Sequence, residues 1–224
     1  MEKSKNLKRR VCWVFLGNLI MAFGVGFLRL SGFGTDPFSC MNLGVSSHLP
    51  VGYGTYQMIF SIVLFVIVFC LDRKSFGFGA VVNMLLLGYM VEFSMFVFDK
   101  MGLTIEGMDM YLVPRIICLI LGVFISCLGA AVYMECDLGA SPYDRLAVVI
   151  EDRTGGKIAF RWARIGYDMI AIAIGYYTGA VVGIATIVVG FCTGPLVSYM
   201  RVHIAGKMIY GKKEKETEKE AVVC

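Results

Sequence analysis

The amino-acid sequence predicts an all-α polytopic membrane protein with six transmembrane helices, built as two inverted three-helix repeats that each carry a short interfacial or re-entrant helix. Apolar residues make up 58% of the 224 residues and charged residues 17%, and the charges lie mostly between long uncharged runs. Uncharged runs of about 18 residues or more are long enough to cross a bilayer as helices. The repeat is indicated by two related segments, FGTDPFS at 33–39 and LGASPYD at 138–144.

The first predicted repeat covers residues 11–98. An uncharged run at 11–28 predicts its first transmembrane helix, which we expect to be retained because no signal-peptide cleavage pattern follows it. Further apolar runs at 54–71 and 76–98 predict the second and third helices. The stretch between the first two runs is too short and too polar to cross the membrane. A helix that begins at Pro37 is therefore expected to be interfacial or re-entrant.

The second predicted repeat covers residues 115–200. Its first transmembrane helix is predicted at 116–134, and a short helix begins at Pro142, the counterpart of the short helix in the first repeat. The stretch 165–200 carries a single charge and is too long for one crossing, so it predicts two helices with a turn at 177–179. Because each repeat crosses three times, the second enters the membrane from the opposite face.

The distribution of lysine and arginine predicts the orientation. With six helices, 18 of the 21 basic residues fall on the side of both termini, including the N-terminus 1–10 and the charged tail 201–224. The linker 99–114 lies on the outer side. Because basic loops stay cytoplasmic, both termini are expected inside a bacterial cell membrane. The net charge of +4 then reflects topology and a lipid bilayer as partner, and no nucleic-acid partner is expected.

The two short helices have recognisable starts. Asp36 and Ser141 can each cap a helix whose first residue is proline, and Asp144 can reach back to the Ser141 N–H as a capping box. In transporters made of inverted repeats, such helix ends meet at a central substrate site and can hold an anion. Arg29 and Arg145 are near enough in sequence to help. Ordinary amphipathic helices on opposite surfaces, with snorkelling arginines, explain the same pattern.

Several polar residues within the predicted helices are candidates for a substrate or ion pathway. Asp168 lies in the fifth helix, where an unpaired carboxylate is usually functional, although pairing with Arg164 or Arg161 is an alternative. Coupling of transport to protons or cations is the hypothesis for Asp168. Glu92 lies near the outer end of the third helix, where a structural role is favoured. Asn18 is more typical of a hydrogen bond between helices than of a ligand contact.

Glycines at 183, 190 and 194 fall, together with Gly179, within an arc of about 60° on a helix. This arc predicts close packing of the sixth helix, against the third helix or against another protomer in a homo-oligomer.

The sequence offers no sign of catalysis. Eight cysteines include no C-x-x-C pair, and the two histidines lie in different regions, so neither a metal site nor a cofactor is predicted. No nucleophile and base pair can be named, so an enzyme is not expected.

The chain also resembles a known family. A Gly-x-x-Pro-aromatic turn follows the first and fourth helices, and the glycine-rich sixth helix ends GFCTGP at 190–195. These features resemble the YczE/YyaS/YitT family of bacterial integral membrane proteins, over nearly the whole chain up to about Met200. The resemblance implies a polytopic membrane protein without a defined biochemical activity. The repeat architecture predicts a small-molecule or ion transporter, and the alternative is an accessory or scaffolding membrane protein that does not transport.

Overall fold

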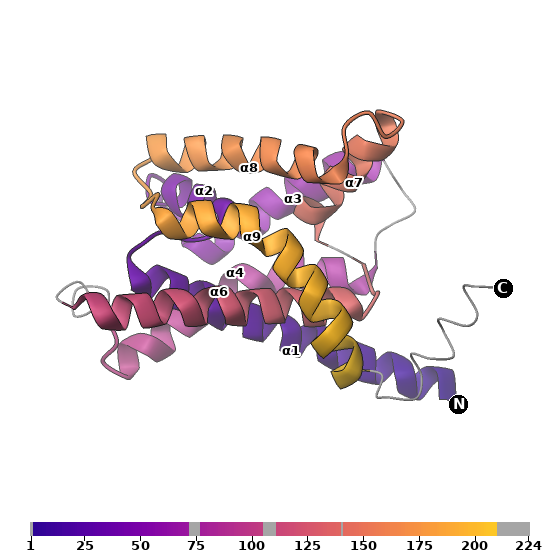
Figure 1. Cartoon of the computed structure of the whole chain (residues 1–224), viewed down its shortest axis with the longest axis horizontal. Helices are drawn as coiled ribbons and strands as arrows, with labels where there is room; N and C mark the ends of the chain where they lie inside the picture. Colours follow the sequence, from indigo (N-terminus) through magenta and orange to yellow (C-terminus); the bar gives the residue numbers. More distant parts are fainter. Residues whose placement is uncertain (1, 72–76, 105–110, 140, 210–224) are drawn as a thin grey trace.

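The computed structural model describes residues 2–71, 77–104, 111–139 and 141–209, and within these ranges the secondary structure is helical. This confirms the all-α prediction. The helices, shown in Figure 1, are α1 (Glu2–Ser31), α2 (Pro37–Ser46), α3 (Tyr53–Leu71), α4 (Phe78–Lys100), α6 (Leu112–Glu135), α7 (Pro142–Arg153), α8 (Phe160–Tyr177), α9 (Ile184–Met200) and the π-helical turn η1 (Arg201–Ala205).

Among the described residues, four helices are long and apolar enough to cross a membrane: α1 from Leu7, α3, α4 and α6. They correspond to the first four predicted transmembrane helices. The fifth and sixth correspond to α8, which carries Arg164 and Asp168, and α9, which has 17 residues. Large apolar side chains are exposed on the outer faces, as a lipid environment requires, and examples on α3 and α6 are Ile59, Val63, Val66, Ile117, Ile120 and Phe124.

The helices form one bundle in which each short helix contacts a long helix from the other half of the chain. The α1 helix packs along α6 and α4, and α3 packs on α4. The short helix α2 packs mainly on α8, whereas α7 packs on α3 and α8. Figure 1 shows α2 and α7 near opposite ends of the bundle.

The contact between α1 and α6 depends on glycine. A Cβ on Gly17 would lie 2.7 Å from the Tyr133 backbone nitrogen, and a Cβ on Gly122 would lie 2.8 Å from the Leu28 backbone nitrogen. The two contacts are related by an offset of 105 positions, which takes Gly17 to Gly122 and Leu28 to Tyr133. A second such pair consists of Gly24 with Ser126 and Gly129 with Met21, each at 2.3 Å. Backbones this close exclude any larger residue at the four glycines.

The turns before the two short helices are also matched. Gly34 and Gly139 both have a φ of +100°, a conformation that favours glycine. Gly34 lies against Gly183, and Gly139 lies against Gly77. Two backbone hydrogen bonds accompany these contacts, from Gly79 N–H to the Leu138 carbonyl at 2.7 Å and from Ala185 N–H to the Phe33 carbonyl at 3.1 Å. The start of α4 is thus bound to the turn before α7, and the start of α9 to the turn before α2.

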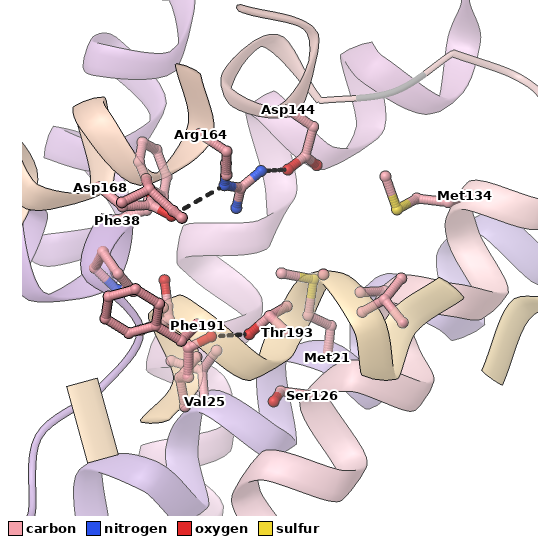
Figure 2. A pocket seen from close by; sticks show the side chains of 18 of the residues that line it. Met21, Val25, Phe38, Ser126, Met134, Asp144, Arg164, Asp168, Phe191 and Thr193 are labelled. Atoms are coloured by element: carbon pink, nitrogen blue, oxygen red, sulfur yellow. Dashed lines mark hydrogen bonds and ion pairs between the residues drawn. The ribbon is translucent and has the colours of Figure 1, made fainter. Parts of the chain in front are cut away.

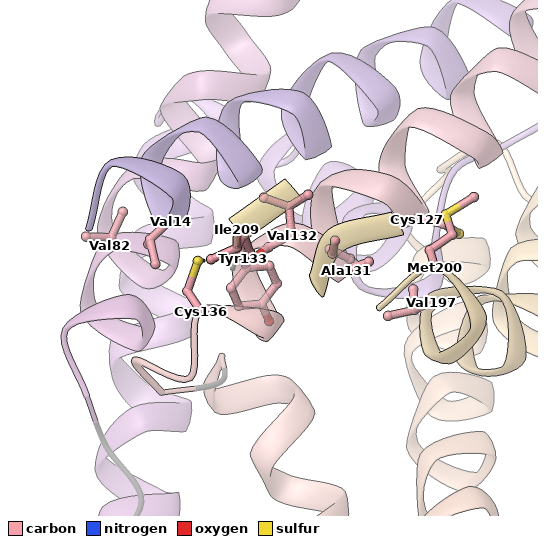
Figure 3. Close-up of a cluster of buried hydrophobic side chains, with 12 residues drawn as sticks. Val14, Val82, Cys127, Ala131, Val132, Tyr133, Cys136, Val197, Met200 and Ile209 are labelled. Atoms are coloured by element: carbon pink, nitrogen blue, oxygen red, sulfur yellow. Dashed lines mark hydrogen bonds between the residues drawn. The ribbon is translucent and has the colours of Figure 1, made fainter. Parts of the chain in front are cut away.

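A buried apolar cluster joins the start and the end of the described chain (Figure 3). It includes Val14 of α1, Tyr133 of α6, Cys136 directly after α6, Met200 of α9, and Ile209 beyond η1. At the same place the Arg10 side chain donates a hydrogen bond of 2.7 Å to the Cys136 carbonyl. The two ends of the described chain therefore lie at the same end of the bundle.

Candidate functional site

A cavity of about 450 Å³ lies between the two halves of the chain. Its lining comes from α1, the start of α2, α6, α7, α8, α9 and the first residue of η1. Most of this surface is apolar. The charged residues that line it are Asp36, Asp144, Arg164, Asp168 and Arg201. Figure 2 shows Asp144, Arg164 and Asp168 on one side of the cavity, with Met21, Val25 and Ser126 across from them.

Arg164 connects two of the carboxylates. Its Nε lies 3.1 Å from Asp168 Oδ2, and its Nη1 forms an ion pair with Asp144 Oδ1 (Figure 2). The Asp168 side chain is only 4% exposed, so its charge depends on this partner. The predicted alternative of pairing between Asp168 and Arg164 is thus present in the structure. The sequence did not indicate that Asp144, 20 positions away, shares the same guanidinium.

Three tyrosines surround this group. The Tyr143 hydroxyl donates to Asp168, and the Tyr133 hydroxyl donates to Asp144 Oδ2 at 2.7 Å. The Arg164 guanidinium lies 4.9 Å from the ring centre of Tyr143 and 5.6 Å from that of Tyr167, both within cation–π range. These contacts come from α6, α7 and α8, so the charged group holds three elements of the second half together.

The prediction of a capping box at α7 is wrong in one of its two hydrogen bonds. Ser141 caps the helix as predicted, with its hydroxyl accepting the Asp144 N–H at 3.2 Å. The Asp144 carboxylate, however, accepts the Ser141 hydroxyl at 2.7 Å instead of the Ser141 N–H, which lies 3.4 Å from the Tyr133 hydroxyl. The physical reason is a competing partner, because the charge of Arg164 attracts this carboxylate more strongly than a backbone N–H does.

Asp36 differs from Asp144 in its environment. Its Oδ2 accepts the Ser39 N–H at 2.9 Å, which confirms the predicted cap of α2, but its buried Oδ1 has no hydrogen-bond partner among the described residues. Burial raises the pKa of Asp36 above its ordinary value, against smaller opposing effects of Ser39 and Arg164. Burial acts on Asp144 as well, but Arg164 and the neighbouring hydroxyls outweigh it, and the pKa of Asp144 is lowered.

Residues 8–202 match a family of unknown function, DUF6198. The chain belongs to this family. It is 27% identical over 197 residues to the uncharacterized membrane protein YczE of Bacillus subtilis, covering 87% of this chain and 86% of YczE. It is 24% identical over 203 residues to the uncharacterized protein YyaS of the same organism, covering 89% and 96%. No solved structure matches the chain. The predicted resemblance to YczE and YyaS is confirmed, and the chain is an integral membrane protein.

Glu92 and Asn18 are two of the candidates that the sequence indicates for a substrate or ion pathway. Neither is among the described residues that line the cavity. Glu92 Oε1 accepts the Gly54 N–H at 2.8 Å at the start of α3. Asn18 accepts a hydrogen bond of 2.7 Å from Asn83 and so connects α1 with α4. Both side chains therefore hold helices in place.

Arg29 and Arg145 also lie outside the described lining of the cavity. The Arg29 guanidinium lies 5.3 Å from the ring centre of Tyr53, and Arg145 lies in the first turn of α7. The charged residues at the cavity include three carboxylates, one of which is Asp36 at the start of α2. This charge favours a cation over the anion that the helix starts alone suggest.

The three glycines of the predicted packing face lie in different surroundings. Gly183 precedes α9, and a Cβ there would lie 2.1 Å from the Phe33 carbonyl oxygen. Gly190 and Gly194 line the cavity. A Cβ on Gly190 would approach only Pro37, at 3.4 Å, and one on Gly194 would meet no described atom within 4 Å. Of these three glycines, Gly183 is thus the one at which another backbone approaches closely.

Sequence reasoning missed Tyr133 and Tyr167 as parts of the site. The predicted repeat holds a signal for Tyr133, which aligns with Leu28 at an offset of 105 positions. It holds another for Arg164 and Asp168, which align with Met58 and Ile62 at an offset of 106. Three members of the charged group, Tyr133, Arg164 and Asp168, thus stand at positions that are apolar in the first copy, whereas Asp144 aligns with Ser39. The polar contacts of the cavity are therefore asymmetric, although the backbone contacts around it are matched.

Proposed function

We propose that this protein is a transporter for a small molecule or ion, with the cavity as its substrate site. One observation carries the proposal: the starts of α2 and α7, contributed by different halves, meet at one cavity together with three carboxylates and Arg164. Secondary transporters place substrate and coupling-ion sites at such an interface between repeats. Catalysis is not part of the proposal.

The proposed architecture is the six-helix inverted repeat, in which α8 and α9 are the fifth and sixth crossings. Support comes from the contacts that recur at an offset of 105 or 106 positions, at Gly17 and Gly122 and again at Gly77 and Gly183. The position of α2 and α7 near opposite ends of the bundle is further support (Figure 1). Because seven of the ten residues of α2 are buried, we propose that this helix is re-entrant.

The proposed orientation has both termini in the cytoplasm of a bacterial cell. The start of α1 and the end of the described chain lie at one end of the bundle, with Arg153 and Arg164 toward the same end of α7 and α8. Arg29 and Arg115 lie at the opposite ends of α1 and α6. The excess of basic residues at the first end supports its cytoplasmic location.

The proposed mechanism is a rocking of the two halves around the cavity, coupled to the charged group. Protonation of Asp168, or a cation bound to it, removes its attraction for Arg164 on the same helix, α8, and weakens it as the acceptor of the Tyr143 hydroxyl on α7. Arg164 then pairs with Asp144 alone, and the contact between these helices changes. A buried arginine that is shared by two carboxylates and can lose one of them is the kind of element that such a transition needs.

A flux experiment tests the proposal. The purified protein is reconstituted in liposomes that contain a pH-sensitive dye, and mixtures of amines, carboxylic acids and sugars are added outside. We expect one class to produce a proton flux that Asp168→Asn abolishes and that Glu92→Gln, a matched charge removal away from the cavity, retains. Absence of flux with every class would support the alternative of an accessory or scaffolding protein.

A further inference from the structure

The charges at the cavity do not balance. Arg164 is already shared by Asp144 and Asp168. Arg201 is paired with Glu135, with its Nε 3.3 Å from the Glu135 carboxylate. Both arginines that line the cavity are therefore engaged. The third carboxylate of the lining, Asp36, takes part in none of the ion pairs found among the described residues.

One oxygen of the Asp36 carboxylate also lacks a hydrogen bond among the described residues. The Ser39 N–H occupies Oδ2, and the buried Oδ1 has no partner among the described residues. A carboxylate can accept about four hydrogen bonds, so most of its capacity is unused. Enclosing a carboxylate in this way is unfavourable unless a donor or a positive charge is supplied. A ligand in the cavity that Asp36 lines is placed to supply the missing group.

The rest of the lining shows what else the occupant contains. The cavity surface includes Phe38, two residues after Asp36, and the apolar residues Phe191, Val25 and Val189. Its volume of about 450 Å³ falls in the usual range for small-molecule pockets, about 300–1,000 Å³. A hydrated inorganic ion would leave this apolar surface without a partner. Among the described residues, moreover, no three His, Cys, Asp or Glu side chains are placed to hold a metal ion.

We propose that the cavity binds an organic monocation, with an ammonium group at Asp36 and an aromatic or branched aliphatic body against Phe38 and Phe191. The inference rests on the proposed function for the role of the cavity, and it adds the class of the ligand. The ammonium group supplies both the donor and the charge that Asp36 lacks. Aromatic rings in the wall bind the apolar body and attract the cation.

The test is a binding experiment on the purified full-length protein in detergent. Three amines of increasing size, isoamylamine, phenethylamine and tryptamine, are compared with the alcohols of the same carbon skeleton. Thermal unfolding is followed as a function of ligand concentration, because a ligand of the folded state raises the Tm. We expect at least one amine to raise the Tm, with an affinity at least about tenfold higher than that of its alcohol.

Two variants locate the ammonium group. In Asp36→Asn the helix cap is preserved, because asparagine caps as well as aspartate, while the charge is lost. We expect the amine affinity to fall at least about tenfold in this variant. Glu92→Gln removes a charge away from the cavity and keeps an oxygen for the Gly54 N–H. We expect this variant to bind like the unaltered protein.

Three results would overturn the inference: no stabilisation by any amine, equal affinity for an amine and its alcohol, or unchanged amine affinity in Asp36→Asn. Each is separable from a failure of the transport proposal. Amine binding without flux in liposomes would leave the ligand class in place and contradict transport. Flux with carboxylic acids or sugars, and no amine binding, would support transport and contradict the ligand class.

Discussion

At the scale of single residues, Arg164 compensates the charge of two of the three carboxylates at the cavity. Its side chain is 27% exposed and faces Asp144 and Asp168, which are 19% and 4% exposed. Replacement of a whole buried ion pair by apolar residues is often neutral for stability, but removal of one partner is costly because it leaves buried carboxylates without a partner. Arg164 is therefore the residue whose loss has the largest consequence.

Substitution of this residue gives a first prediction. Arg164→Gln should lower the free energy of unfolding by about 3–5 kcal/mol, the usual loss when one partner of a buried ion pair is removed. Denaturant or thermal unfolding in detergent measures it. Arg153→Gln is the matched control, because Arg153 donates one exposed hydrogen bond to the Leu71 carbonyl and should matter little. Adding Asp168→Asn to Arg164→Gln should recover part of the loss, and a purely additive loss would argue against the coupling.

A second prediction concerns pH. The amine affinity should fall as the pH decreases through the pKa of Asp36, because the protonated carboxyl is neutral. Burial raises this pKa, so the loss should begin above the ordinary value of 3.8. The groups that share its surroundings are Arg164 and Asp168 on α8, Asp144 on α7 and Tyr53 on α3. Titration calorimetry from pH 4 to pH 8 measures it, and Asp36→Asn should show no such dependence. An equal slope in both proteins would assign the titration to another group.

At the scale of helices, the matched turns before α2 and α7 give a third prediction. A Cβ on Gly77 or on Gly183 would lie 2.1 Å from a carbonyl oxygen of the opposite turn. Gly77→Ala and Gly183→Ala should therefore both reduce the yield of monodisperse protein and its Tm. The control is Gly166→Ala in α8, where a Cβ meets no described atom within 4 Å and alanine favours the helix. Loss in only one of the two turns would contradict their equivalence.

The helices and their starts were predictable because the forces that form them are local. Apolar runs of sufficient length predict α1, α3, α4 and α6, and the capping chemistry of Asp36 and Ser141 predicts the first residues of α2 and α7. The side-chain partners were less predictable. The sequence predicts that the Asp144 carboxylate binds a backbone group in its own turn, whereas Arg164 from another helix binds it. Tertiary ion pairs leave no periodic pattern in a single sequence.

At the scale of the whole molecule, the orientation gives a fourth prediction. Met101, which follows α4, is 67% exposed, and Met208 near the end of the described chain is 45% exposed. In a chain whose native exposed cysteines are replaced by serine, Met101→Cys should react with a membrane-impermeant thiol reagent in intact cells. Met208→Cys should react only after the cells are opened. Labelling of Met208→Cys from outside would contradict the cytoplasmic C-terminus. Cys40 and Cys136 are buried and unsuitable as probes.

The packing of α2 on α8 has a consequence for synthesis. The helix α2 ends at Ser46 and α8 begins at Phe160, so 113 residues separate the two partners. At a translation rate of about 5–20 residues per second, α2 is complete roughly 6 to 23 s before its main contact begins to leave the ribosome. During that interval α2, with Asp36 at its start, lacks the partner for the face that later packs on α8. The interval before α8 is synthesised is thus the stage at which membrane quality control can recognise and degrade the nascent chain.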